Sequence, residues 1–118
     1  MEFDTFDTET FADELAQAEN NREIATRVLF ENERVRVWEL ALEPGQRAPF
    51  HCHAVPYFFT CVDAGRSLSR FPNGTSVEVD YAEGDTWFDN IANGPEIHDL
   101  ENIGDNRLRF TTVELLDS

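Results

Sequence analysis

Residues 45–53 read Gly-Gln-Arg-Ala-Pro-Phe-His-Cys-His, a turn glycine followed by a strand-like run that ends in two histidines. Side chains along a strand alternate between its two faces, so His51 and His53 project from one face and Cys52 from the other. Two imidazoles placed in this way can reach one metal ion at about 2.0–2.2 Å. His98, the only other histidine of the chain, falls on another predicted strand and is a third candidate metal ligand.

Short β-like segments separated by turn residues make up the chain from about residue 24 onward. The turns are rich in glycine, proline and asparagine, and Asn73-Gly74 is a strong signal for a hairpin. About eight short strands without alternating helices predict an all-β antiparallel sandwich or barrel and argue against a parallel nucleotide-binding sheet. The predicted strands span residues 34–42, 48–53, 57–62, 67–71, 76–81, 85–88, 96–102 and 107–115.

The first 27 residues differ from this pattern. Phe11, Leu15 and Ala18 recur at helical spacing, and a threonine is available as an N-terminal cap, so we expect a short helix over residues 8–22. The acidic residues before it are expected to form a loose tail. We therefore expect an N-terminal tail and helical arm over residues 1–27 and a β-barrel over residues 28–118.

The charge balance and the cation type exclude several functions. Twenty-four acidic residues against nine basic ones give a net charge of −15, which repels nucleic acid and anionic membranes. All nine cations are arginine, so Schiff-base chemistry and lysine-bound pyridoxal phosphate are excluded. The chain has two cysteines, its first residues do not resemble a signal peptide, and it has no apolar run long enough to span a membrane. These features predict a soluble cytoplasmic protein.

Two stretches of the chain resemble the motifs of the cupin family. Residues 45–65 resemble the first motif, in which His-x-His follows a glycine, and residues 84–102, which contain His98, resemble the second. The resemblance covers residues 28–116. It implies an RmlC-like jelly roll, a double-stranded β-helix with a divalent metal at one end of its interior, and it also implies a homodimer. The pattern is further similar to small cupins assigned to β-alanine degradation.

The resemblance also implies a ligand set with one departure from the family. Cupins usually offer three histidines and one glutamate, but the glutamate position falls on Phe58. The remaining set resembles that of three-histidine cupins, which include thiol dioxygenases and a diketone-cleaving dioxygenase. Without the carboxylate, the site keeps the full charge of the ion, which favours an anionic small-molecule ligand. Three imidazoles suit Fe, Zn, Ni, Mn or Cu.

Two polar residues near the first motif are candidate catalytic groups. The phenol of Tyr57 is placed to orient a substrate or donate a proton. Alternatively, its ring only packs against apolar neighbours while its hydroxyl contacts water. The planar guanidinium of Arg47 suits a substrate carboxylate, or alternatively forms one half of a weak surface ion pair.

Further residues are candidate members of the pocket. Glu96 lies two residues before His98 and shares its strand face, which makes it a candidate fourth ligand. Asp99 has the opposite parity and is expected to face solvent. The residues expected to line the pocket are Phe58, Glu96 and Trp38.

Two functions fit these observations. The first is a metal-dependent enzyme that acts on a small organic molecule, with an Fe(II) dioxygenase as the candidate reaction class. The second is a non-catalytic cupin in which the ion only anchors a small ligand. A metal-free sugar epimerase or isomerase needs a histidine base paired with a carboxylate, which the clustered His-x-His disfavours.

Overall fold

The structure, a computed structural model, describes residues 1–116 as ten β-strands and a short helical arm. The arm consists of η1 (Thr8–Phe11), α1 (Ala12–Gln17) and η2 (Ala18–Asn20). The strands are β1 (Glu2–Thr5), β2 (Arg27–Glu31), β3 (Val35–Leu42), β4 (Arg47–His53), β5 (Tyr57–Asp63), β6 (Gly65–Arg70), β7 (Thr75–Tyr81), β8 (Thr86–Asp89), β9 (Glu96–Asn102) and β10 (Leu108–Leu115).

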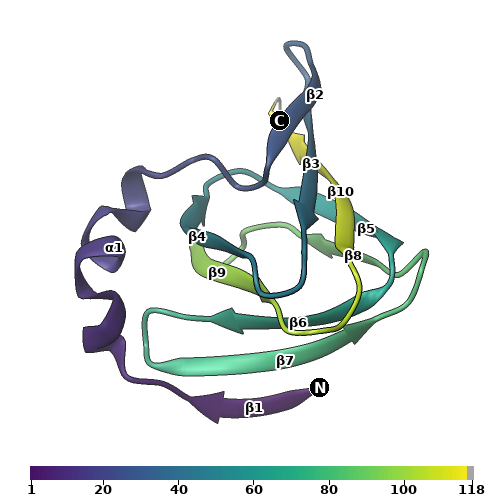
Figure 1. Ribbon diagram of the computed structural model, residues 1–118. Coiled ribbons are helices and arrows are strands. Elements are labelled where there is room, and N and C mark those ends of the chain that lie inside the picture. Colours follow the sequence, from purple (N-terminus) through teal and green to yellow (C-terminus); the bar gives the residue numbers. More distant parts are fainter. Residues whose placement is uncertain (117–118) are drawn as a thin grey trace.

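The strands form two antiparallel sheets that enclose a barrel interior (Figure 1). One sheet has the order β1-β7-β6-β9-β4, and the other has the order β2-β3-β10-β5-β8. From β3 onward the chain crosses to the other sheet after every strand except at the β6–β7 hairpin. This alternation is that of a jelly roll, so the predicted double-stranded β-helix is confirmed.

The predicted strands are confirmed, each to within two residues at its ends. The hairpin at Asn73-Gly74 joins β6 to β7, and Gly74 has a φ of +88°, a conformation that favours glycine because a Cβ would be strained there. The prediction of a loose N-terminal tail is wrong, because residues 2–5 form β1 and pair with β7. An open sheet edge offers backbone hydrogen bonds to any extended segment, whatever its side chains.

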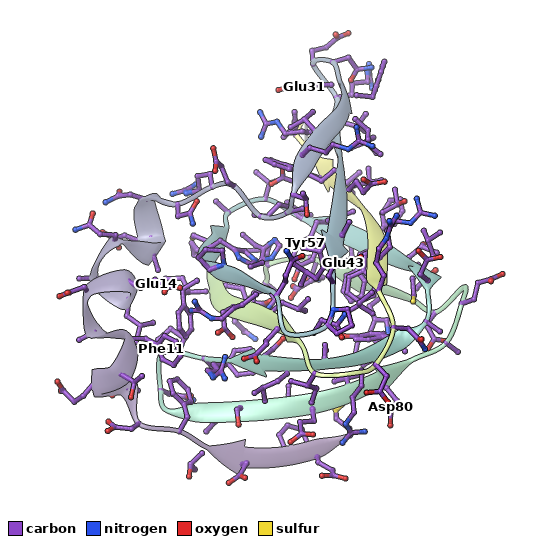
Figure 2. The ribbon with its side chains drawn as sticks, viewed as in Figure 1. Phe11, Glu14, Glu31, Glu43, Tyr57 and Asp80 are labelled. Atoms are coloured by element: carbon purple, nitrogen blue, oxygen red, sulfur yellow. The ribbon has the colours of Figure 1, made fainter. Side chains whose placement is uncertain are left out.

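The helical arm is shorter than predicted and covers the outer face of β4. Only six residues, Ala12–Gln17, are α-helical, and single 3₁₀ turns flank them. Phe11 packs edge-on against Phe50, with ring centroids 5.6 Å apart, and Glu14 accepts a hydrogen bond from the Phe50 backbone. Phe11 and Glu14 point from the arm toward the barrel in Figure 2, whereas Glu31 and Asp80 point away from it.

The core lies between the sheets and borders the site described below. It is built from alternate residues of the central strands, which is the pattern that places their apolar side chains on the inner face. None of the described helices is long or apolar enough to span a bilayer. The buried core cluster consists of Leu40, Leu42, Cys61, Leu100, Leu108 and Phe110.

Candidate metal centre

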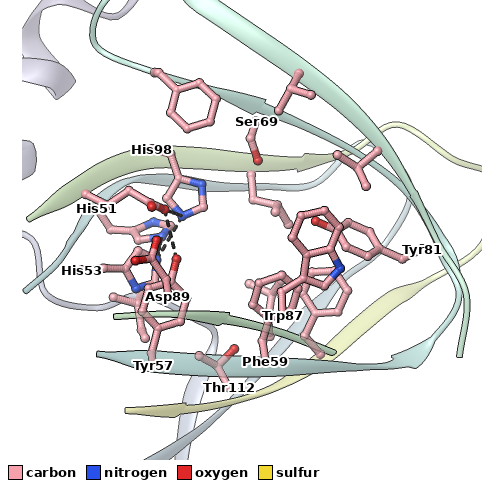
Figure 3. Close-up of a pocket in the computed structure, with 18 of the residues that line it drawn as sticks. His51, His53, Tyr57, Phe59, Ser69, Tyr81, Trp87, Asp89, His98 and Thr112 are labelled. Atoms are coloured by element: carbon pink, nitrogen blue, oxygen red, sulfur yellow. Dashed lines mark hydrogen bonds and ion pairs between the residues drawn. The ribbon is translucent and has the colours of Figure 1, made fainter. Parts of the chain in front are cut away.

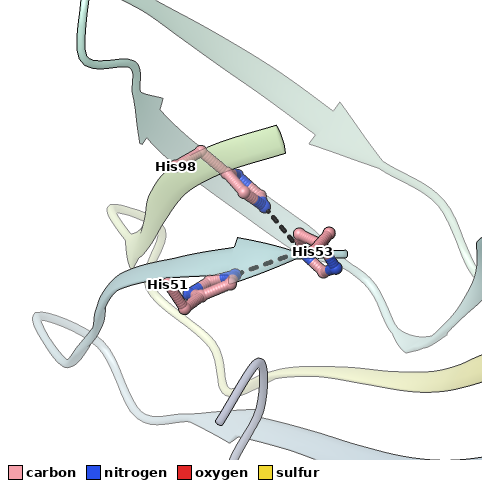
Figure 4. A group of neighbouring side chains, drawn as sticks. All are labelled: His51, His53 and His98. Atoms are coloured by element: carbon pink, nitrogen blue, oxygen red, sulfur yellow. Dashed lines mark hydrogen bonds between the residues drawn. The ribbon is translucent and has the colours of Figure 1, made fainter. Parts of the chain in front are cut away.

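The three histidines lie together on the inner face of one sheet (Figure 4). His51 and His53 share a face of β4, and His51 lies opposite His98 of β9 in the strand register. The Nε2 atom of His53 is 3.2 Å from Nε2 of His51 and 3.0 Å from Nε2 of His98. One ligand atom from each ring lies within 4.8 Å of the others. Pairing of neighbouring strands therefore brings the distant His98 to the His-x-His pair.

The donor and acceptor roles of these rings fit a shared cation. The Nδ1 atom of His51 lies 2.7 Å from the Pro49 carbonyl and must donate to it, which leaves Nε2 with a lone pair. Each neutral imidazole has only one N–H, so three converging Nε2 atoms cannot all satisfy one another. Ligand nitrogens about 2.0–2.2 Å from one ion are roughly 3.0–3.4 Å apart, which matches the His53–His51 and His53–His98 separations given above. The residues present therefore fit a divalent metal.

Burial keeps all three imidazoles neutral. Loss of hydration lowers the pKa of His51 and His98, and it lowers the pKa of His53 to about 3 with a further contribution from His51. A neutral imidazole offers its lone pair without first losing a proton. The rings are thus in the form that binds metal.

Tyr57, and not Phe58, is the β5 residue that faces the histidines. The Tyr57 ring stacks on His53, with centroids 4.0 Å apart and planes at 15°, and it lines the cavity. Phe58 is the next residue along the strand, lies on the opposite face and does not line the cavity. The prediction that Phe58 lies in the pocket is therefore wrong, because a shift of one residue along a strand exchanges its faces.

Two carboxylates lie beside the histidine group. Tyr57 Oη donates to Glu96 Oε1 at 3.0 Å, and the same oxygen is 3.7 Å from His98 Nε2. Burial, together with the neighbouring Asp89, raises the pKa of Glu96 to about 7. The hydrogen bond with Glu96 and the backbone N–H of Ile91 lower the pKa of Asp89. Glu96 lines the cavity where it was expected, but it is not part of the compact three-histidine group.

A cavity of about 350 Å³ extends from the histidines into the barrel (Figure 3). The histidines, Tyr57 and Asp89 lie at one end of the view, and Phe59, Tyr81 and Trp87 lie at the other. Most of the lining is apolar. The candidate metal centre is therefore open to a small molecule on its cavity side.

Arg47 does not reach this cavity, so the expectation that it holds a substrate carboxylate is wrong. Its Nε donates to Asp99 at 2.7 Å, it contacts Glu14, and its guanidinium lies 4.6 Å from the centroid of the Phe11 ring. Asp99 is fully buried instead of facing solvent, and it also accepts from the backbone and side chain of Arg70. The positions of Arg47 and Asp99 differ from the predictions for the same reason: the N-terminal arm covers this outer face of the sheet.

Trp38 and the two cysteines also lie outside the cavity. The Trp38 indole is buried and donates to Glu114 Oε1 at 2.7 Å, so its predicted place in the pocket wall is wrong. Cys52 is buried on the face opposite the histidines, as its parity predicts. Cys52 and Cys61 are both free thiols.

Comparison with known proteins shows which solved structures share the fold of this chain. No family model matches the chain, and no curated protein matches it. A cupin domain from Bordetella pertussis matches with a TM-score of 0.69 and 27% identity, over 80% of this chain and 96% of that one.

Two further solved structures show the same fold at lower identity. A double-stranded β-helix protein from Klebsiella pneumoniae matches with a TM-score of 0.60 and 19% identity, over 86% of this chain and 85% of that one. An RmlC-like cupin from Methanocaldococcus jannaschii matches with a TM-score of 0.58 and 19% identity, over 75% and 76%. With the jelly-roll strand order, these matches show that the chain has the double-stranded β-helix fold of RmlC-like cupins, and its three-histidine group is a possible metal site.

Proposed function

We propose that this cupin is a metal-dependent enzyme that acts on a small organic molecule, with Fe(II)-type dioxygenation as the reaction class to test first. One observation carries the proposal: three histidine Nε2 atoms converge at the wall of a cavity of about 350 Å³. Three protein ligands leave positions open, as in catalytic rather than structural metal sites. An Fe(II) ion held there would supply the one-electron chemistry that the use of dioxygen requires.

The residues of the chain would bind the ion, exclude water from the cavity and hold a proton on the Tyr57 hydroxyl. His51, His53 and His98 would hold the ion, and imidazole ligands are compatible with Fe, Zn, Ni, Mn or Cu. The apolar walls exclude water, which strengthens polar contacts inside the cavity. The Tyr57 hydroxyl keeps its proton on the hydrogen bond to Glu96, beside the open side of the site.

The positive charge of a bound ion would favour a ligand that is anionic at one point. No arginine side chain is among the described residues that line the cavity, so the ion would be the positive charge that an anionic group meets beside the histidines. A phosphorylated sugar usually needs basic side chains around its phosphate. This arrangement therefore also disfavours the isomerase alternative.

Oxygen consumption distinguishes the enzyme from the binding protein. Protein loaded anaerobically with Fe(II) is mixed with thiols, β-diketones, short amino acids or short keto acids, and oxygen uptake and products are measured. We expect uptake in proportion to bound iron for one of these classes, and none for the zinc-loaded protein. Saturable binding of a ligand without oxygen uptake or product would instead establish the non-catalytic cupin.

We also propose that the protein is a homodimer joined through β2, which projects from the barrel in Figure 1. Among the described strands, β2 pairs only with β3, and its Val28, Leu29 and Phe30 side chains are exposed. Two copies of β2 packed antiparallel about Leu29, the residue at the bulge between Val28 and Phe30, bring Arg27 near the partner's Glu31 and the apolar residues together. This contact is self-complementary about a two-fold axis.

Replacement of Leu29 by Lys is expected to convert the dimer to a monomer, because two ammonium groups would meet on the axis. Light scattering coupled to size-exclusion chromatography measures the mass. The matched control is Ile103→Lys, which places the same charge at another exposed apolar position and should leave the dimer intact. A wild-type monomer, or a dimer that survives Leu29→Lys, would rule out this interface.

A location in the cytoplasm and the similarity to cupins of β-alanine degradation stay predictions. The free state of Cys52 and Cys61 agrees with the first.

A further inference from the structure

We infer that the cavity binds an aryl acid, in which a short linker joins one aromatic ring to one anionic donor group. The inference rests on the proposed function, because the donor would meet the ion. It goes further in naming the part of the ligand that the protein recognises through its own side chains. Three features of the cavity carry it: an aromatic end, a separation of polar from apolar groups, and a limited volume.

The end of the cavity away from the histidines is aromatic on several sides. Phe59 and Trp87 are nearly parallel, with ring centroids 6.4 Å apart, and Tyr81 packs edge-on against Phe110 at 4.9 Å. Phe59 also contacts Phe110 at 5.1 Å. Tyr81 comes from one sheet and the other three rings come from the second sheet, so the rings do not all lie on one wall. Offset and edge-on contacts of this kind are those that a further aromatic ring prefers.

Exposed apolar surface on Trp87 would stabilise a ligand bound at this end of the cavity. Its indole is 43% exposed although it lines the cavity, whereas Phe110 beside it is buried. A ligand ring laid against the exposed part of Trp87 would remove this apolar area from water, which stabilises the complex by about 25 cal/mol for each Å² buried.

The charged side chains of the cavity are confined to its histidine end. The carboxylates Glu96 and Asp89 lie beside the histidines, and none of the aromatic residues at the other end carries a charge. A sugar or another hydroxyl-rich ligand would leave hydroxyls unpaired against the aromatic rings. A short aliphatic acid would reach the ion but leave the aromatic end unfilled. A ligand with one polar end and one flat apolar end satisfies both halves.

The volume limits the length of the ligand. At about 30 Å³ for each non-hydrogen atom, the share that water takes in the liquid, roughly a dozen atoms fill the cavity. The cavity of about 350 Å³ lies near the lower end of small-molecule sites. One phenyl ring with a two-carbon linker and a carboxylate has this size.

Titration calorimetry of the zinc-loaded protein tests the inference without turnover. The probes are 3-phenylpropionate and propionate, which share the carboxylate and linker and differ only in the ring. We expect 3-phenylpropionate to bind at least ten-fold more tightly than propionate. Affinities that agree within three-fold would overturn the inference.

A variant of the aromatic end separates ring recognition from metal binding. Trp87→Ala is expected to weaken binding of 3-phenylpropionate at least five-fold, with propionate affinity and zinc stoichiometry unchanged. Ile103→Ala, at an exposed position outside the cavity, is the control and should change neither affinity. An equal loss for both acids, or no loss for either, would contradict the assignment.

The same experiment shows whether the proposed function fails instead. Zinc bound at far less than one ion for each chain would refute the metal centre. Ring-dependent binding of 3-phenylpropionate to the metal-free protein would then still support the aromatic end, and its absence would refute that end as well.

Discussion

Replacement of His53 by Ala is expected to reduce the affinity for a divalent transition metal by more than about 100-fold. Removal of groups that only support a metal ligand reduces affinity by about 10–100-fold, and loss of a ligand exceeds this. His53 is the central member, because its Nε2 contacts those of both His51 and His98. Without His53, only the imidazoles of His51 and His98 remain to bind the ion.

Elemental analysis and thermal unfolding measure this effect independently. Protein purified without added metal should contain close to one transition-metal ion for each chain, and His53→Ala should contain almost none. Zinc at one hundred times its Kd stabilises a fold by about 2.7 kcal/mol, which is roughly 10 °C in Tm for a domain of this size. The variant should lose this shift, whereas Ser69→Ala, which alters the cavity lining away from the histidines, should keep it.

Glu96→Gln decides whether the site has a fourth protein ligand. Tyr57 and Asp89 hold the Glu96 carboxylate, and it lies outside the three-histidine group. We therefore expect this variant to retain metal in the same assay. Metal loss as severe as that of His53→Ala would instead establish Glu96 as a ligand.

The strands and the histidine pair could be predicted from the sequence because both depend on local rules. Turn residues mark the strand ends, and the period of two fixes which neighbours share a face. The same rule places His51 with His53 without knowledge of the fold. The position of His98 opposite His51 needed the family resemblance, because strand pairing is not encoded locally.

The errors occurred where long-range packing decides the outcome. Phe58 and Tyr57 are adjacent, so an offset of one residue in the motif chose the wrong face of β5. The grouping of the rings at the aromatic end and the place of Asp89 were not predicted, because they depend on the pairing of β8 with β5, which places Trp87 opposite Phe59. The alternation along a strand shows that Trp87 and Asp89 share one face of β8, and that Tyr57 and Phe59 share one face of β5. It does not show that β5 and β8 are neighbours in the sheet. Asp99 was expected in solvent because no local signal shows that the arm covers it.

Replacement of Asp99 by Ala is expected to destabilise the fold by about 3–5 kcal/mol, the range for removing one member of a buried ion pair. The Asp99 carboxylate is fully buried and accepts from Arg47 Nε at 2.7 Å and from Arg70 Nη1 at 2.9 Å. Both guanidiniums are mostly covered, so their charges would lose an acceptor that water replaces poorly. Urea unfolding followed by circular dichroism measures the change.

Asp80→Ala provides the matched control, because Asp80 also accepts from an arginine, Arg66, but its side chain is 74% exposed. Exposed pairs contribute about 0–1 kcal/mol, so this variant should unfold close to the wild type. Asp99→Asn keeps the shape and removes the charge, and it should fall between the two.

The arm provides a second readout of the same change. Arg47 bridges Asp99 to Glu14 of α1, and the Cys52 amide donates to the Asn21 carbonyl at 2.7 Å. If Asp99 fixes the arm through Arg47, the Cys52 amide should exchange its hydrogen faster in Asp99→Ala than global unfolding alone allows. Equal stability of Asp99→Ala and Asp80→Ala would show that the buried cluster does not fasten the arm to the sheet that carries the histidines.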